Sequence, residues 1–330
     1  MTVPALLRDR LRLPVVAAPM FIISRPELVI AQSIAGIVGS FPTLNARPQP
    51  ELRNWLHRIT RALAAHDAAH PEAPSAPYAV NLIVHKTNDR LDADLEVVEE
   101  FRVPIVITSL GARPEVNERI HAYGGIVLHD IVDNVFAHKA IDKGADGLIA
   151  VAAGAGGHAG TRSPFALIQE IRTWFDGPLA LSGALATGDA VLAARAAGAD
   201  LGYIGSLFIA TAEADAVPGY KQMLVDSSAA DIVYTDLFTG VPGNYLRGSI
   251  EAVGLDPDDL PRSDPSAMDF GSGGAMEAKA WRDIWGAGQG VGRIDTIDTT
   301  QGVVDRLVAE YRAARARIAA DELDGYAVQS

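Results

Sequence analysis

Apolar residues along the chain fall alternately into short continuous runs and longer segments with a period near 3.6 residues. The short runs have the length and composition of strands that are buried on both faces. They predict eight strands, at 15–20, 36–43, 78–84, 104–110, 125–131, 147–153, 178–183 and 201–209. The longer segments predict helices near 26–35, 50–66, 89–101, 114–122, 133–143, 164–175 and 187–197.

Local signals mark the ends of several predicted helices. Thr187 stands where an N-cap is expected, and Ser163-Pro164 combines an N-cap with a proline in the first turn. Gly144 and Gly198 each follow a helical segment and precede Ala-Asp and the next strand, as glycines just past a helix end do.

Eight strands, each followed by a helix, predict an α/β protein with the closed (β/α)8 TIM barrel fold. A doubly wound open sheet has the same local rhythm and is the alternative, but the number of strands favours closure. The rhythm stops at 212–299, which is rich in Pro, Gly and Asp, and an amphipathic helix follows at about 302–321. We therefore expect a barrel core at 1–211, an inserted cap at 212–299 and a closing C-terminal helix within 300–330.

Composition excludes several kinds of function. The formal net charge of −13, without a cluster of Lys and Arg, argues against nucleic-acid binding. With no cysteine in the chain, disulfides, iron–sulfur clusters and Cys-ligated zinc are excluded. The zinc motif H-E-x-x-H is missing too, so no metal site is expected. We find neither an 18-residue apolar run nor an export signal, so we expect no membrane association and a cytoplasmic location.

Barrel enzymes place their active sites where the strands end, and they commonly bind phosphate in the loops after strands seven and eight. Ser182-Gly183-Ala184 ends the predicted seventh strand, and Gly205-Ser206 lies in the predicted eighth. Small residues there let backbone N–H groups approach a phosphate. The alternative is that these glycines only permit tight turns.

The loop after the sixth strand, residues 154–160, reads Gly-Ala-Gly-Gly-His-Ala-Gly. His158 is its only side chain capable of acid–base chemistry, and imidazole is a natural general base near neutral pH. A lone histidine is usually structural, but a glycine-lined loop at the catalytic end of a barrel favours a role in chemistry. His85 and His129, near the ends of the third and fifth strands, are weaker candidates.

The same loop matches G-x-G-x-x-G/A, the fingerprint of dinucleotide-binding proteins. That fingerprint requires the helix to begin within the motif, whereas Ser163-Pro164 places the helix start several residues later. No acidic residue ends the following strand to hold a ribose. We therefore expect no classical dinucleotide site.

Several motifs together resemble the nitronate monooxygenase family, formerly called 2-nitropropane dioxygenases. The resemblance covers nearly the whole chain, and the Gly-Gly-His-x-Gly loop with the late Ala-Gly-Gln element is its most specific part. The residues that match the family pattern are 18–20 (Ala-Pro-Met), 80–82 (Val-Asn-Leu), 155–160, 181–183 (Leu-Ser-Gly), 204–206 (Ile-Gly-Ser), Phe208 and 285–289 (Trp-Gly-Ala-Gly-Gln). These proteins are FMN-dependent barrels related to flavin-containing enoyl-acyl-carrier-protein reductases and NADH:quinone reductases.

The resemblance implies FMN across the strand ends and His158 as the catalytic base that removes an α-proton from a nitroalkane. O2 would then be consumed, and the nitronate would yield a carbonyl compound and nitrite. The implied cofactor-binding residues are Pro19, Met20, Asn81, Asp130, Gly156, Gly157, Ser182, Gly183, Ala184, Gly205, Ser206 and Gln289. Of these, Met20 and Asn81 would line the isoalloxazine ring.

The chain departs from the family pattern at a few positions. Asp130 stands where some relatives have Lys, and Val151 aligns with an acidic residue of several members. These differences leave the exact substrate open. Because the scaffold and the His loop would look alike, the alternative is an NAD(P)H-dependent FMN reductase acting on a quinone or an enoyl thioester. A third, non-redox alternative is a flavin-free barrel that binds a phosphorylated metabolite. A homodimer is compatible with the sequence, and residues 232–247 could form its contact or gate the site.

Overall fold

The structure, a computed structural model, describes residues 4–262 and 283–320. Parallel strands form its central sheet in the order β1-β9-β8-β6-β5-β4-β3-β2. The ends of this sheet meet through a bridge between Val16 and Val38, where Ala17 N–H donates to Val38 O at 2.8 Å. The strands are β1 (Val15–Ala17), β2 (Gly39–Pro42), β3 (Tyr78–Ile83), β4 (Ile105–Ser109), β5 (Ile126–Ile131), β6 (Gly147–Val151), β8 (Leu179–Ser182) and β9 (Leu201–Ile204). The predicted TIM barrel is confirmed.

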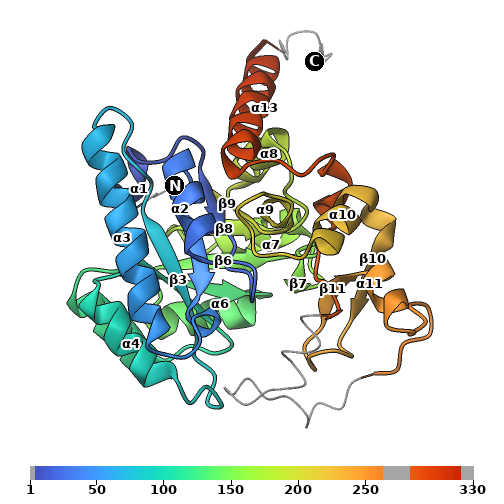
Figure 1. The fold of residues 1–330 in the computed structure, drawn as a ribbon, viewed down its shortest axis with the longest axis horizontal. Helices are drawn as coiled ribbons and strands as arrows, with labels where there is room; N and C mark the ends of the chain where they lie inside the picture. The colour runs from blue at the N-terminus through green and yellow to red at the C-terminus, as the bar shows by residue number, and fades with distance from the viewer. Residues whose placement is uncertain (1–3, 263–282, 321–330) are drawn as a thin grey trace, which may run out of the picture.

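A ring of helices surrounds the barrel (Figure 1). They are α2 (Pro26–Ala35), α3 (Glu51–Ala69), α4 (Leu91–Glu100), α5 (Pro114–Ala122), α6 (Asn134–Asp142), α7 (Pro164–Arg172) and α8 (Gly188–Ala197), each close to its predicted bounds. In α3 the buried residues Leu52, Leu56, Ile59 and Leu63 recur every three or four positions, which turns one apolar stripe toward the sheet. The Thr187 hydroxyl accepts from Ala190 N–H at 3.1 Å, as its predicted N-cap role requires.

The interior of the barrel is packed with inward-facing side chains from alternate strand positions. These form one buried cluster with Leu7, and its strand members include Val16, Ala79, Ile105, Ile107, Leu128, Ile149, Ala180 and Leu201. Leu7 comes from the short helix α1 (Ala5–Arg8), lies before β1 and is 1% exposed. Because this end of the barrel is filled, the carboxyl ends of the strands are left for a site.

The eighth strand is shorter than predicted. It ends at Ile204, and Ser206–Ile209 form a helical turn, α9, instead of continuing the strand to residue 209. Leu207, Phe208 and Ile209 are all buried in the cluster that includes residues of the C-terminal helix. A short apolar run does not distinguish a strand from a buried helical turn, which explains the error.

Between α9 and the C-terminal helix the chain forms α10 (Pro218–Asp226), β10 (Ile232–Thr235), β11 (Gly243–Leu246), α11 (Arg247–Ala252) and η4 (Gln289–Arg293). Strand β11 pairs antiparallel with β10 on one side and with β7 (Gly157–His158) on the other. Part of the loop predicted after the sixth strand is therefore a strand. The division of the chain at residues 211 and 299 stays a prediction.

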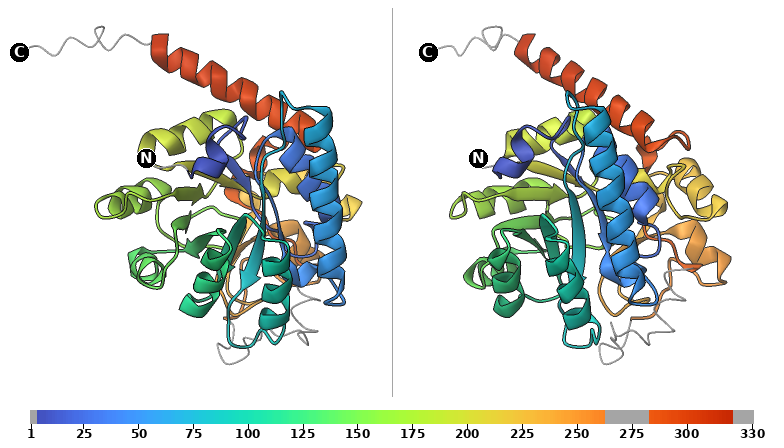
Figure 2. Two further views of the ribbon diagram at one scale, coloured as in Figure 1. Left: turned by 90° about the vertical axis from the view of Figure 1, so that its left-hand side faces the viewer. Right: turned by 60° about the vertical axis from the view of Figure 1, so that its left-hand side comes forward.

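The last helix, α13 (Thr300–Ala320), packs against α8 and α2. Glu310 accepts a hydrogen bond from Gly188 N–H at 2.8 Å, and Arg195 donates to the Tyr311 hydroxyl at 2.8 Å. Figure 2 shows α13 running across the ring of helices and extending past it. Helix α13 thus occupies the position of the eighth barrel helix, between α8 and α2.

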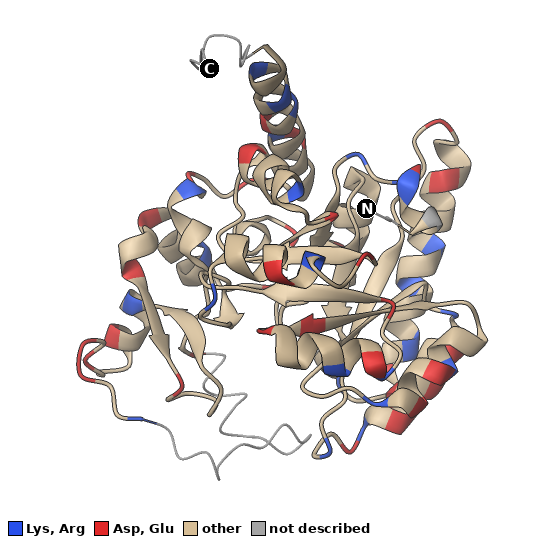
Figure 3. Cartoon of the chain, turned by 180° about the vertical axis from the view of Figure 1, so that it is seen from behind, with Lys and Arg blue, Asp and Glu red and all other residues tan. Residues whose placement is uncertain are grey.

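Charged residues lie mainly on the outer helices and loops, with acidic residues densest along α4 (Figure 3). Within residues 4–262 and 283–320, no helix has both the length and the apolar character needed to cross a membrane.

Candidate active site

A cavity of ≈ 300 Å³ lies at the carboxyl ends of the barrel strands. Every strand of the barrel supplies a residue near or just after its carboxyl end. These are Pro19 and Met20 after β1, Pro42 of β2, Asn81 of β3, Ser109 of β4, Asp130 of β5, Val151 of β6, Ser182 of β8 and Tyr203 of β9. The position of the cavity is the one expected for the active site of a barrel enzyme.

A smaller pocket adjoins this cavity and shares Gly156, Ser182 and Gly205 with it. It lies between the loop after β8 and the start of α9, where the first N–H groups of a helical turn have no partner within the turn. All of its described lining residues are uncharged: Gly154, Ala155, Gly156, Ser182, Gly183, Ala184, Leu185, Ala186, Tyr203, Ile204, Gly205, Ser206, Leu207, Gly288, Gly290 and Ile294. This set offers backbone amides and hydroxyls at close range, which fits a phosphate group.

Backbone geometry explains why this pocket needs small residues. Gly183 has φ +142° and Ala184 has φ +56°, so the turn after β8 passes through conformations that larger side chains disfavour. A Cβ at Gly156 would come within 2.8 Å of Gly288 N. The late Gly-rich segment and the loop after β6 can therefore touch only because both lack side chains there.

His158 is held at the cavity by β7, opposite Gly243 of β11. Its Nε2 lies 2.9 Å from the Thr239 hydroxyl, which donates to Val241 O at 3.0 Å. These two contacts fit the tautomer in which Nε2–H donates to Thr239 Oγ1 and the lone pair of the imidazole is on Nδ1. Burial lowers the pKa of His158 to about 4, so the ring is neutral at pH 7 and can accept a proton.

Asp130 lines the same cavity and is the last member of a series of hydrogen-bonded side chains. Asn81 Nδ2 donates to Ser109 Oγ at 2.7 Å, and Ser109 is hydrogen-bonded to Asp130. Burial raises the pKa of Asp130 to about 6, although the Ser109 contact acts in the opposite direction. Burial, and to a smaller extent the Asp130 carboxylate, hold the pKa of Tyr203 well above its usual range.

The structure brings almost all of the predicted site residues together. His158 and the predicted cofactor-binding residues line one or both pockets, except Gln289. Gln289 lies beside them, where its N–H donates to Gly154 O at 2.9 Å. Proximity does not test their roles, which stay predictions.

The two weaker histidine candidates lie outside the described lining of both pockets. His129 faces the helix side of β5, and its Nδ1 is 2.6 Å from Thr108 Oγ1. Strand alternation places it opposite to its neighbour Asp130. His85 contacts the Thr87 hydroxyl at 2.9 Å, two residues further along the chain.

Sequence reasoning missed Thr239, Arg47 and Tyr203. Tyr203 could have been found, since it lies just before Gly205 at the end of the eighth strand. Thr239 and Arg47 come from connecting segments without a recognisable motif, and only folding places Thr239 next to His158, 81 positions earlier.

Comparison with known proteins gives one family match over most of the chain. The model of a family described as nitronate monooxygenase matches residues 6–310. The match includes the residues of both pockets, the β7 histidine and about half of α13.

The individual relatives have low sequence identity to this chain. A putative monooxygenase of Mycobacterium tuberculosis is 27% identical over 231 residues, 66% of this chain, and the chain spans 61% of that relative's length. A nitronate monooxygenase of Paraburkholderia phytofirmans is 27% identical over 302 residues, covering 81% of this chain and 82% of the relative. The structure of a nitroalkane oxidase from Streptomyces ansochromogenes has a TM-score of 0.78 at 24% identity, covering 95% of this chain and all of that one (100%). This last likeness supports the fold.

Proposed function

Because the chain belongs to the nitronate monooxygenase family and is therefore a flavin-dependent oxidoreductase, we propose that it uses FMN and O2 to oxidise nitronates. The products would be a carbonyl compound and nitrite, and nitroalkanes would also be substrates. The observation that carries this proposal is the neutral His158 imidazole at the cavity, with its Nε2 2.9 Å from the Thr239 hydroxyl. The family match and the nitronate monooxygenase relative support the choice of substrate.

The residues around the two pockets suit a flavin mononucleotide. The uncharged amides and hydroxyls near Gly183 and Ser206 would hold its phosphate, while Met20 and Asn81 would contact the ring. When bound, the flavin would supply the electron transfer that no side chain of the protein can perform. The protein's part is then to orient the substrate, exclude water and move a proton.

His158 would act on the neutral nitroalkane. Thr239 keeps Nε2 protonated, so Nδ1 accepts the α-proton and the carbon acid becomes a nitronate in the cavity. A nitronate supplied from solution already lacks this proton and does not need the base. This difference separates the base from the remaining parts of the site.

The test is a His158→Asn variant assayed on 1-nitropropane and on preformed propyl-1-nitronate. General base catalysis contributes about 10²- to 10⁴-fold, so kcat/KM on the nitroalkane should fall at least 100-fold. Activity on the nitronate should stay within about threefold of the original, because its oxidation does not use the base. His57→Asn, on the exposed face of α3, is the control and should change neither value. An equal loss on both substrates contradicts the base role.

The bound cofactor and the electron donor need a separate measurement. Flavin released by denaturing the purified protein should run as FMN in chromatography. Addition of NADH without oxygen should leave the flavin absorbance unchanged, while a nitronate should reduce it. Rapid bleaching by NADH, with no turnover of nitronate, would identify the chain as an NAD(P)H-dependent FMN reductase instead.

A further inference from the structure

The charged groups of the cavity are unevenly distributed. Among the described residues that line it, Arg47 is the one Lys or Arg, and Asp130 is the one carboxylate. Arg47 comes from the connection after β2 and is exposed, whereas Asp130 is on β5 among the residues implied to hold the cofactor. The cavity lining also includes the apolar residues Phe21, Leu44 and Ile83, and the first two contact Arg47.

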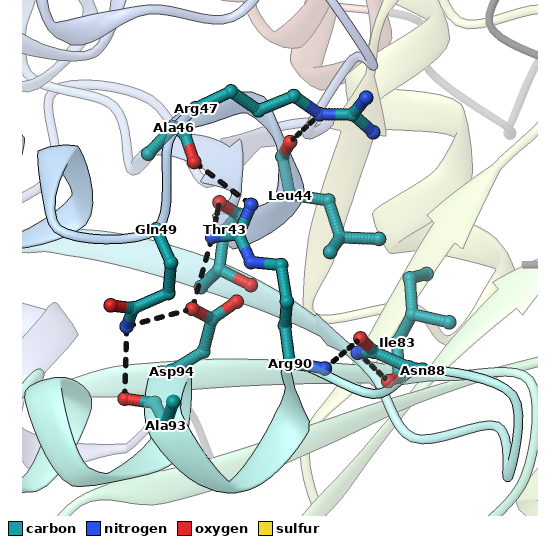
Figure 4. A network of polar contacts seen from close by, with 10 residues as sticks. All are labelled: Thr43, Leu44, Ala46, Arg47, Gln49, Ile83, Asn88, Arg90, Ala93 and Asp94. Atoms are coloured by element: carbon teal, nitrogen blue, oxygen red, sulfur yellow. Dashed lines mark hydrogen bonds and ion pairs between the residues drawn. The ribbon is translucent and has the colours of Figure 1, made fainter. Parts of the chain in front are cut away.

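The Arg47 side chain is partly fixed by its neighbours. Its Nε donates to Leu44 O at 3.0 Å, and its guanidinium carbon lies 5.5 Å from the centre of the Phe21 ring. Within the described parts of the chain, Arg47 makes no ion pair with Asp or Glu. In Figure 4 the two Nη atoms point beyond Leu44, away from the surrounding polar contacts. The edge of the guanidinium that binds an anion in a bidentate manner is thus not used by a carboxylate of these segments.

A buried network holds the backbone on both sides of Arg47 (Figure 4). Arg90 pairs with Asp94 at 3.0 Å, and the two side chains are 12% and 0% exposed. The Arg90 guanidinium also donates to Ala46 O at 2.9 Å and Thr43 O at 3.3 Å. Gln49 donates to the Asp94 carboxylate at 3.2 Å. The segment that carries Arg47 is therefore anchored before any ligand binds, which lowers the entropic cost of using this arginine for recognition.

We propose that Arg47 is a substrate-binding residue that holds an anionic group, a carboxylate or a phosphate, at the end of the substrate distant from the reacting carbon. The inference rests on the proposed function for the identity of the reacting group. The apolar wall of Phe21 and Leu44 would contact the carbon chain between the two ends. A substrate with an acidic tail would thus be preferred over one that ends in a methyl group.

Kinetics of an Arg47→Gln variant test the proposal with two nitronates of similar length. Propionate-3-nitronate carries a carboxylate tail and propyl-1-nitronate does not. Loss of a charge-assisted contact should lower kcat/KM on the carboxylate substrate about 10- to 100-fold. The methyl-ended substrate should change less than about twofold, since it makes no such contact. Arg61→Gln, on the exposed face of α3, is the matched control and should leave both values unchanged.

Ligand binding separates this proposal from the proposed function. The visible spectrum of the flavin is followed while 3-nitropropionate, 1-nitropropane or coenzyme A is added without oxygen. A spectral change with 3-nitropropionate that Arg47→Gln weakens at least tenfold supports a carboxylate ligand. If coenzyme A is the one ligand whose spectral change Arg47→Gln weakens at least tenfold, the bound group is a phosphate. Arg47 would then still be an anion-binding residue, even if the protein oxidises no nitronate.

Three outcomes would overturn the proposal. The first is an equal loss of kcat/KM on both nitronates, and the second is binding of all three ligands that does not depend on Arg47. The third is weaker retention of FMN by Arg47→Gln, which would make Arg47 a cofactor contact.

Discussion

At the scale of single residues, burial sets the chemistry of the cavity by moving two pKa values in opposite directions. Burial lowers the pKa of His158 to about 4 and raises that of Asp130 to about 6. In both cases the uncharged form is the one that an apolar, enclosed site favours. The His158 ring is thus neutral across the physiological pH range, whereas Asp130 titrates near the lower limit of that range.

The displaced pKa of Asp130 predicts a pH-dependent effect on stability. The folded protein holds a proton on Asp130 up to pH of about 6, whereas the usual value is 3.8. The stabilising contribution is therefore complete below pH 3.8 and is lost as the pH rises through 6. Asn cannot titrate, so the Asp130→Asn variant does not lose this contribution. The Tm of the variant minus the Tm of the original protein should therefore increase as the pH rises from 4.5 to 7.5. Thermal melts of both proteins at several pH values measure this difference.

The histidines are common to both proteins, so their own titration cancels from the comparison. Asp142→Asn, an exposed position on α6, is the control and should show a constant difference in Tm. A difference for Asp130→Asn that stays flat over the same range would contradict the pKa assigned here.

At the scale of elements, the small sheet β10-β11-β7 places the catalytic candidate. His158 is on a two-residue strand whose pairing partner, β11, follows it by more than 80 positions. Asn244 of β11 also donates to Ala155 O at 2.6 Å, which ties the glycine loop to the same strand. A loop that would otherwise be free to move is thus held by backbone and side-chain hydrogen bonds.

This pairing predicts the effect of Gly243→Ala. A Cβ at Gly243 would lie 2.7 Å from Gly157 O and 2.9 Å from Gly157 C, so β7 and β11 must separate. We expect a loss of about 1–3 kcal/mol in the free energy of unfolding, as for overpacking of a buried site. Turnover of 1-nitropropane should fall about tenfold or more, because His158 moves with β7 and misplacement of a catalytic group is costly.

Denaturant titration and steady-state kinetics measure the two effects. Gly219→Ala is the control, since a Cβ at that position of α10 meets only Trp285, at 3.4 Å. It should keep stability and turnover, and a loss as large as that of Gly243→Ala would show that the effect is not specific to β7.

At the scale of the whole molecule, α13 connects the first and the last parts of the barrel. It packs against α8 and α2, and Arg12 near the first strand pairs with Asp305 of α13 at 2.7 Å. This exposed pair should contribute little. The close approach of α13 to the start of α8 is the larger constraint, because Gly188 leaves no room for a side chain.

Gly188→Ala should therefore weaken the docking of α13. A Cβ at Gly188 would clash with Leu307 O and Tyr311 N, which are backbone atoms. We expect a loss of about 2–3 kcal/mol in the free energy of unfolding, because a helix must shift to make room. Hydrogen exchange should show the earliest opening in α13. Unchanged stability would mean that α13 shifts at no cost and does not constrain the barrel.

Some whole-molecule predictions from the sequence stay untested: the cytoplasmic location, the homodimer, the absence of nucleic-acid partners and the boundaries of the cap. Sedimentation of the purified protein would decide the oligomeric state. The family and the enzyme class predicted from the motifs are confirmed by the family match.

The sequence by itself determined the barrel, because strands buried on both faces and amphipathic helices leave periodic patterns that do not depend on distant contacts. It also located His158 and the glycines that we propose to bind phosphate, since the ends of barrel strands converge on one face whatever the loops do. Only the tertiary structure decided that residues 206–209 form a helical turn and that Gly157–His158 form a strand. It alone placed Thr239 beside His158 and Arg47 at the cavity. These features depend on contacts between segments far apart in the chain, and such contacts leave no periodic trace in the sequence.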